Sequence, residues 1–414
     1  MKKLIEWQSG WRKIASIAIF IVLGAIFGIV CPEQQWIGIF GDIFIGALKA
    51  LAPVLVFLLV SSALANQTSS SRKKFRTIII LYLVTTLLAA VVAVAASYIF
   101  PVKITLASQA ENTPPANLTE VFRTLLINMV SNPVASISSG NYIGILFWAV
   151  VLGIILKGIA HDSTRELMSD LSEAVSNAIQ YVIVFAPIGI FGVVYSSVSS
   201  NGLAIFTDYG KLLLLLVGCM LVTSLIVNPI LASLILKRNA YPLVFRCLRE
   251  SGIYAFFTRS SAANIPVNMQ LCEKLGLSKD FYSVSIPLGS TINMDGAAVT
   301  IAILSLSLCH TLGIVVHPVQ ALILCVVSTL GACGASGVPG GSLLLIPMAC
   351  ALFGIENDVA MQAVAVGFII GVIQDSVETA LNSSGDAIFT AVAEYHDRAK
   401  RGEPMNFLGD FAKK

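Results

Sequence analysis

Two stretches of this 414-residue chain place carboxylate and amide side chains inside segments that are otherwise apolar. The first is Ser285–Ala298, which has Asn293-Met-Asp-Gly296 at its centre. A carboxylate is costly at mid-membrane depth, and the proline and glycines of this stretch are poor helix formers. The pattern predicts an unwound turn whose free backbone carbonyls, together with Asp295, coordinate a cation or a substrate. The alternative is a polar helix that packs against a polar neighbour.

The second stretch is a stripe of polar residues in the last apolar segment, and helical spacing places all of its members on one face. They are Asp375, Glu378, Thr379, Asn382 and Asp386. Such a stripe must face something other than lipid. Lys49 and Arg259 are the two basic residues that we expect to lie deep inside the membrane segments, and two positive charges are too few to neutralise these acids and Asp295. Bound metal cations or protons could do so, and hard oxygen ligands suit an alkali cation.

The composition indicates what must hold these residues in place. The chain is 56% hydrophobic and 12% charged, with a mean hydropathy of +0.85, which predicts a polytopic helical membrane protein. The eight cysteines form no CxxC pair, so neither a disulfide framework nor a zinc site is expected. The net charge of +3 is too small to indicate nucleic-acid binding. Although Cys31 follows the first apolar run, Val30 is too large for a lipoprotein cleavage site, and we interpret the run as a transmembrane helix.

Eight apolar runs are long enough to be predicted as spans. They cover residues 14–30, 42–65, 77–100, 141–160, 175–198, 209–236, 281–310 and 358–393. Most lysines and arginines fall in alternate connections between these runs, which predicts that both termini are cytoplasmic.

Two further apolar segments, 243–272 and 318–353, are broken at their centres. Their middles are Thr258–Pro266 and Gly334–Ser342, which are rich in small residues and proline. Because lipid cannot satisfy the backbone of such a break, each segment predicts a helical hairpin that enters the membrane and returns. The alternative is a kinked spanning helix. Each broken segment precedes a span with buried polar residues, a weak internal repeat of the kind that transporters use to build a midplane site.

Four motifs in this order resemble the glutamate-transporter family of dicarboxylate/amino-acid:cation symporters, over nearly the whole chain. They are Asn293-Met-Asp-Gly296, Thr258-Arg-Ser-Ser261, Gly337-Val-Pro-Gly340 and Asn382-Ser-Ser-Gly-Asp386. The string from Arg249 to Pro266 is similar, within that family, to the bacterial serine/threonine:sodium symporters. The resemblance implies an all-α fold with inverted repeats, eight transmembrane helices and two re-entrant hairpins.

The resemblance also implies three sodium sites. One uses Asn382 and Asp386 with backbone carbonyls near Gly289 and Asn293, beside Met294. A second uses the carbonyl of Thr291 and the outer hairpin tip. A third joins Asp295 to a polar cluster in the third span, Tyr82, Thr85 and Thr86. Sodium ions are thus the expected coupling ions, and no covalent cofactor is expected.

For the substrate, the resemblance implies that Asp375 holds an ammonium group, while Ser261 and Asn382 hold a carboxylate. Arg259, Ser260, Val338, Glu378 and Thr379 complete the expected pocket. Members that carry acidic amino acids have an arginine at the position of Glu378 and a threonine at that of Ala297. A carboxylate at position 378 would repel an acidic substrate. Arg259 can reach either Asp375 or Glu378 from the inner hairpin.

The expected function is a sodium-coupled secondary active transporter in the bacterial cytoplasmic (inner) membrane, importing serine and threonine by alternating access. The alternative is a sodium- or proton-coupled symporter of acidic amino acids or dicarboxylates. The scaffold part is expected mainly at 13–65 and 141–198, the transport part mainly at 77–100 and 209–393. The family implies a homotrimer in the lipid bilayer. A channel is a competing hypothesis, as is a membrane enzyme with Ser260 or Ser261 as nucleophile; no histidine lies near these serines within a span, and we expect no enzyme.

Overall fold

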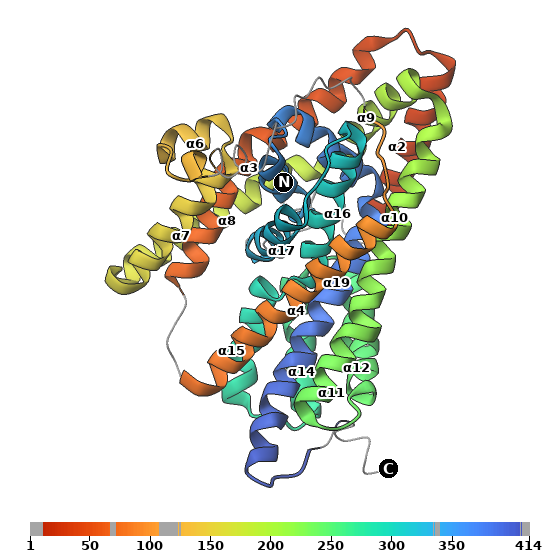
Figure 1. The fold of residues 1–414 in the computed structure, drawn as a ribbon. Helices are drawn as coiled ribbons and strands as arrows, with labels where there is room; N and C mark the ends of the chain where they lie inside the picture. Colours follow the sequence, from red (N-terminus) through yellow and green to blue (C-terminus); the bar gives the residue numbers. More distant parts are fainter. Residues whose placement is uncertain are drawn as a thin grey trace.

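The computed structural model describes residues 11–66, 72–106, 123, 126–333, 335, 340–405 and 407. Every regular element in these ranges is helical, which confirms the predicted all-α class (Figure 1). The helices of the first half are α2 (Trp11–Val30), α3 (Ile39–Ala65), α4 (Arg72–Ile99), α6 (Pro133–Ser139), α7 (Tyr142–Ile159), α8 (Asp162–Val184) and α9 (Ala186–Asn201). Those of the second half are α10 (Ile205–Val222), α11 (Asn228–Leu236), α12 (Tyr241–Cys247), α13 (Ile253–Thr258), α14 (Ser261–Lys274), α15 (Lys279–Ile292), α16 (Asp295–Leu312), α17 (Pro318–Ala332), α18 (Ile346–Cys350) and α19 (Asn357–Lys400).

Short turns of 3-10 helix or π-helix lie next to several of these α-helices. Single 3-10 turns lie at Gln35–Gly38, Gly202–Ala204, Leu343–Leu345 and Ala351–Phe353. Turns of π-helix lie at Thr223–Val227 and Leu248–Gly252. The first π-turn directly precedes Asn228-Pro229, where the proline lacks the N–H that a regular helix needs.

Among the described residues, six helical stretches are long and apolar enough to cross a membrane, or seven if α8 and α9 form one span. This count agrees with a multi-pass membrane protein. α8 and α9 meet at an angle of 59°, so the run predicted at 175–198 is bent rather than straight. The bend falls just before Pro187, whose ring cannot continue a regular helix from the preceding turn.

The helices of the first half pack closely through glycine. α2 lies against α9, and α3 lies against α7, α8 and α9. A Cβ atom on Gly24 would lie 2.8 Å from the carbonyl oxygen of Phe191, and one on Gly192 would lie 2.4 Å from the backbone nitrogen of Gly41. Glycine is therefore required where these helix backbones touch, as is common between membrane helices.

α19 lies at the centre of the second half (Figure 1), where it contacts α13, α14, α15 and α16. Its predicted polar stripe faces these neighbours, because each of the five side chains is at most 6% exposed. α4 packs on α16 and α17 and also contacts α19. This arrangement gathers the polar residues of four separate chain segments around the middle of α19.

Candidate ion and substrate site

The predicted break in the helix at Asn293-Met294 is present. α15 ends at Ile292 and α16 begins at Asp295, while Asn293 and Met294 have the non-helical φ,ψ values −93°,79° and −120°,54°. A Cβ atom on Gly296 would lie 2.9 Å from the Cα atom of Glu378, so glycine allows this turn to approach α19. Asp295 sits at the N-terminus of α16, where the helix dipole favours a negative charge.

Asp295 is fully buried and receives hydrogen bonds from neutral donors. Thr86 Oγ1 donates to Oδ1 at 3.1 Å, and Asn228 Nδ2 donates to Oδ2 at 3.2 Å. Thr85 Oγ1 donates to the neighbouring Asn293 Oδ1 at 3.3 Å. The predicted cluster on α4 therefore meets the unwound turn. On this side Tyr82 contributes its backbone carbonyl, which lies 3.0 Å from Thr85 Oγ1 and 2.8 Å from Thr86 Oγ1 and competes for their hydroxyl protons.

Asp386 is also buried and lies beside the unwound turn. Asn293 Nδ2 donates to its Oδ1 at 3.0 Å. Among the described residues, Asp386 Oδ2 has no hydrogen-bond partner. A Cβ atom on Gly289 would lie 2.7 Å from Oδ1 and 2.8 Å from the Tyr82 hydroxyl. Glycine at 289 thus lets the backbone approach the Asp386 carboxylate, whose other oxygen, Oδ2, still has capacity for a ligand.

The Tyr82 hydroxyl points toward Asp386 rather than Asp295. Its oxygen lies 3.2 Å from the Ser285 carbonyl and 3.3 Å from the Asp386 carbonyl, so the single hydroxyl proton has two candidate acceptors, and it lies 3.1 Å from Thr390 Oγ1. Thr390 Oγ1 in turn donates to Ser285 Oγ at 3.0 Å. Tyr82 therefore touches the surroundings of both acids, one through its carbonyl and one through its hydroxyl.

Asn382 ties the stripe on α19 to the unwound turn. Its Oδ1 accepts from the backbone N–H of Gly296 at 2.7 Å, and its Nδ2 lies 3.4 Å from Met294 Sδ. Its carbonyl accepts from Asn293 Nδ2 at 3.1 Å. Asn382 and Met294 are thus in contact at the junction of α19 with the unwound turn.

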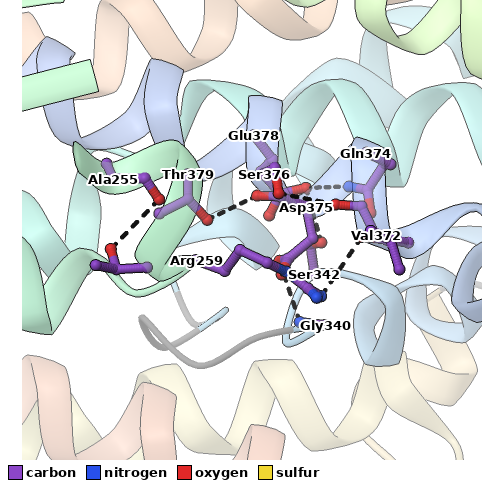
Figure 2. A network of polar contacts seen from close by, with 12 residues as sticks. Ala255, Arg259, Gly340, Ser342, Val372, Gln374, Asp375, Ser376, Glu378 and Thr379 are labelled. Atoms are coloured by element: carbon purple, nitrogen blue, oxygen red, sulfur yellow. Dashed lines mark hydrogen bonds and ion pairs between the residues drawn. The ribbon is translucent and has the colours of Figure 1, made fainter. Parts of the chain in front are cut away.

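Arg259 pairs with Asp375 and not with Glu378 (Figure 2). Arg259 Nε donates to Asp375 Oδ2 at 2.7 Å, and the backbone N–H of Gly340 donates to Oδ1 at 3.2 Å. Arg259 has a φ of +52° and ends α13, so this left-handed residue turns the chain and aims the guanidinium at α19. Thr379 Oγ1 donates to the Asp375 carbonyl at 2.7 Å, within the helix.

Glu378 belongs to a separate cluster beside this ion pair (Figure 2). Its Oε2 accepts from Thr300 Oγ1 at 2.7 Å, Ser342 Oγ at 2.9 Å and Gln374 Nε2 at 2.5 Å. None of these three bonds uses Oε1. The side chain is 5% exposed, and its position is fixed by donors from α16, α19 and the segment after the outer tip.

The remaining expected residues lie at the start of α14, near the end of α15 and in the segment before Gly340. Ser260 is the N-cap of α14 and accepts from the N–H of Ala263 at 3.2 Å, while Ser261 is the first residue of that helix and is 4% exposed. Thr291 is exposed, and its hydroxyl donates to the Leu288 carbonyl at 2.8 Å. Val338 lies outside the described residues, as does most of the outer tip that was expected to join Thr291.

A cavity of about 20 Å³ lies beside the Arg259–Asp375 pair. Ile17, Ile183 and Ile190, from the first half of the chain, line it together with the pair. Such a cavity has room for about one water molecule. Any molecule larger than water would need the lining residues of this cavity to move apart.

Residues 14–395 match the sequence model of the sodium:dicarboxylate symporter family. The chain belongs to the sodium:dicarboxylate symporter family. Membership of this family makes the protein a transporter, in agreement with the expectation that it is not an enzyme. The motifs that carried the resemblance are thus those of an established symporter family.

Within the sodium:dicarboxylate symporter family, the chain is similar to proteins described as serine/threonine transporter SstT. The protein from Bifidobacterium adolescentis is 56% identical over 406 residues, covering 98% of this chain and 94% of the relative. The protein from Streptococcus agalactiae serotype III is 54% identical over 399 residues, covering 95% of this chain and 98% of the relative. The similarity therefore extends over nearly the full length of both relatives.

Several polar residues of the site were not singled out in the sequence. They are Asn228, Ser285, Thr300, Ser342, Gln374 and Thr390. Asn228 and Gln374 are amides inside apolar segments. Asp295 stood out because a polar side chain is costly in such a segment, and the same reasoning would have found these two residues. The hydroxyl residues carry no such signal, because serine and threonine in helices usually bond their own backbone.

Proposed function

We propose that this symporter couples an inward sodium gradient to the import of serine and threonine by alternating access. The coupling to sodium is supported by the hydrogen-bond partners of the two buried acids. Asp295 and Asp386 receive neutral hydrogen bonds, and Asp386 Oδ2 receives none from the described residues. Because a buried carboxylate needs a compensating positive charge, a cation ligated by these oxygens accounts for both. The sodium assignments remain as expected from the sequence, with Asn228 added beside Asp295.

The substrate proposal rests on the charges around Asp375. The substrate ammonium would replace Arg259 on Asp375, and its carboxylate would bind Ser261 and Asn382. The Asn382 amide contacts a methionine sulfur, a weak acceptor, so little is lost when this donor turns to a carboxylate. Glu378 Oε1 would then accept the substrate hydroxyl, since the three donors on Oε2 hold the group in place.

The proposed architecture has eight spans and two re-entrant hairpins, at 243–272 and 318–353. Helices of 13–65 and 141–198 would form the scaffold part, and helices of 77–100 and 209–393 the transport part. We infer that the subunits form a homotrimer in the cytoplasmic (inner) membrane with both termini in the cytoplasm. The cavity beside Asp375 supports the alternating step, because residues of both parts line it and it is too small for the substrate.

The decisive experiment measures uptake of labelled serine by proteoliposomes that hold the purified protein. Uptake should require an inward sodium gradient, should saturate, and should be competed by unlabelled serine and threonine. A flux that does not saturate would contradict a transporter and favour a channel. Equal uptake without sodium would contradict the coupling.

A second candidate is a symporter of acidic amino acids or dicarboxylates, coupled to sodium or protons. Arg259 favours it, because a guanidinium beside the pocket could pair with a second carboxylate. Glu378 opposes it by its charge. The same proteoliposomes separate the two candidates: aspartate competing as well as serine would establish the acidic substrate.

A further inference from the structure

Lys49 of α3 forms an ion pair with Asp358, in the first turn of α19. The pair joins the two parts of the proposed transporter, since α3 belongs to the scaffold part and α19 to the transport part. Other pairs, such as Arg259–Asp375 and Lys274–Glu250, join residues within the transport part. A contact that bridges the two parts must open whenever they move past one another.

A lysine at position 49 is unexpected on packing grounds alone. It lies in a 27-residue helix whose other residues are mostly apolar, and Asp42 is the other charged residue of that helix. An ionisable residue inside such a helix is expected to have a functional partner. Pro53 stands four residues later and cannot donate to the Lys49 carbonyl, so the helix is weakened at the same turn.

Neither member of the pair is enclosed by other parts of the protein. The Lys49 side chain is 41% exposed and that of Asp358 is 74% exposed. Asp358 also sits at the N-terminus of α19, where the helix dipole favours a carboxylate even without a partner. An exposed pair of this kind contributes modestly to stability, which suits a contact that must form and break repeatedly.

The surroundings of the pair favour one relative position of the two helices. Asp42 lies two helical turns before Lys49 on the same face of α3. It lines a cavity of about 50 Å³ together with Gln362 of α19, one turn beyond Asp358. A shift of α19 toward Asp42 would therefore replace an attraction with a repulsion between two acids.

We propose that the Lys49–Asp358 ion pair is a latch between the two parts. It stabilises the arrangement seen in the structure and sets how often the transport part leaves it. The inference depends on the proposed function only in treating the two parts as bodies that move relative to each other.

The test measures the population of this arrangement without using substrate. Phe44 of α3 and Phe368 of α19 lie with ring centroids 5.3 Å apart, across the same boundary. The native cysteines are first replaced, and Phe44→Cys and Phe368→Cys are then introduced together. The rate at which a short bifunctional thiol reagent crosslinks the two new cysteines reports this contact. Lys49→Gln should slow crosslinking about two- to fivefold, as expected for loss of one exposed pair. Lys49→Asp should slow it further, and combining Lys49→Asp with Asp358→Lys should restore the original rate.

The control is Lys211→Gln, which removes an exposed pair with Asp208 inside α10 and should leave crosslinking unchanged. A general folding or insertion defect would not be repaired by the exchanged pair. Unchanged crosslinking in Lys49→Gln and Lys49→Asp would overturn the latch, as would an exchanged pair that crosslinks no faster than Lys49→Asp. Failure of sodium-dependent serine uptake by the protein with its native cysteines would count against the proposed function instead.

Discussion

The side-chain amide of Asn293 donates to the Asp386 carboxylate at 3.0 Å, across 93 positions of sequence. Its oxygen meanwhile accepts from Thr85, whose neighbour Thr86 bonds Asp295. Asn293 therefore contacts the surroundings of both candidate cation ligands from the unwound turn. One side-chain amide thus connects the hydrogen-bond networks around Asp295 and Asp386.

Replacing Asp295 or Asp386 with asparagine should raise the sodium concentration needed for half-maximal serine uptake at least about tenfold, or about 1.4 kcal/mol. Each change removes a formal charge from a dehydrated site where Coulomb attraction is poorly screened. The measurement is uptake by proteoliposomes over a range of external sodium. Asp208→Asn is the control, because this acid lies at an exposed helix turn and pairs with Lys211. An unaltered sodium dependence in both site variants, with normal insertion, would remove the cation assignment.

Gly289→Ala should reduce sodium-driven uptake about tenfold or more. The added methyl group would lie 2.7 Å from Asp386 Oδ1 and 2.8 Å from the Tyr82 hydroxyl, closer than real Cβ contacts allow. The matched control is Gly218→Ala on α10, where nothing lies within 4 Å of the added atom. That variant should transport normally, because helical alanine is favoured over glycine. Equal activity of the two variants would show that the Gly289 backbone is not needed by the site.

Gly340→Val should abolish uptake while the protein still inserts into the membrane. Gly340 has a φ of +74°, its N–H donates to Asp375, and a Cβ atom would lie 2.9 Å from the Phe368 ring. Gly313→Val is the control for backbone strain alone, since Gly313 has a φ of +70° with nothing within 4 Å. Normal transport by Gly340→Val would favour the plain kinked helix over a hairpin tip.

Glu378→Arg combined with Ala297→Thr should move selectivity from serine toward aspartate. The arginine supplies a bidentate partner for a second carboxylate and removes the repulsion from Glu378. Turnover should fall, because Thr300, Ser342 and Gln374 lose their shared acceptor. The measurement is the ratio of aspartate uptake to serine uptake, which does not depend on the total transport rate. If the wild-type protein already prefers aspartate, Arg259 and not Glu378 determines the substrate class.

The sequence by itself determined the membrane class, the family and the main polar positions. Asp295 and the α19 stripe stand out because charge inside an apolar segment is costly, and the intervals within the stripe fix its common face. The breaks at Asn293 and Arg259 were also predictable, since glycine, proline and polar residues oppose a continuous helix. These signals are local, so they can be recognised without knowing which residues each side chain contacts in the folded protein.

Only the tertiary structure decided which of these residues meet. Whether Arg259 pairs with Asp375 or Glu378 depends on how a left-handed residue at the end of α13 aims its side chain across to α19. The contact of Asn228 with Asp295, and the three donors on Glu378, depend on packing between elements far apart in the chain. Hydroxyl and amide groups give no directional signal in a sequence, because their partners are set by helix positions that only the folded chain defines.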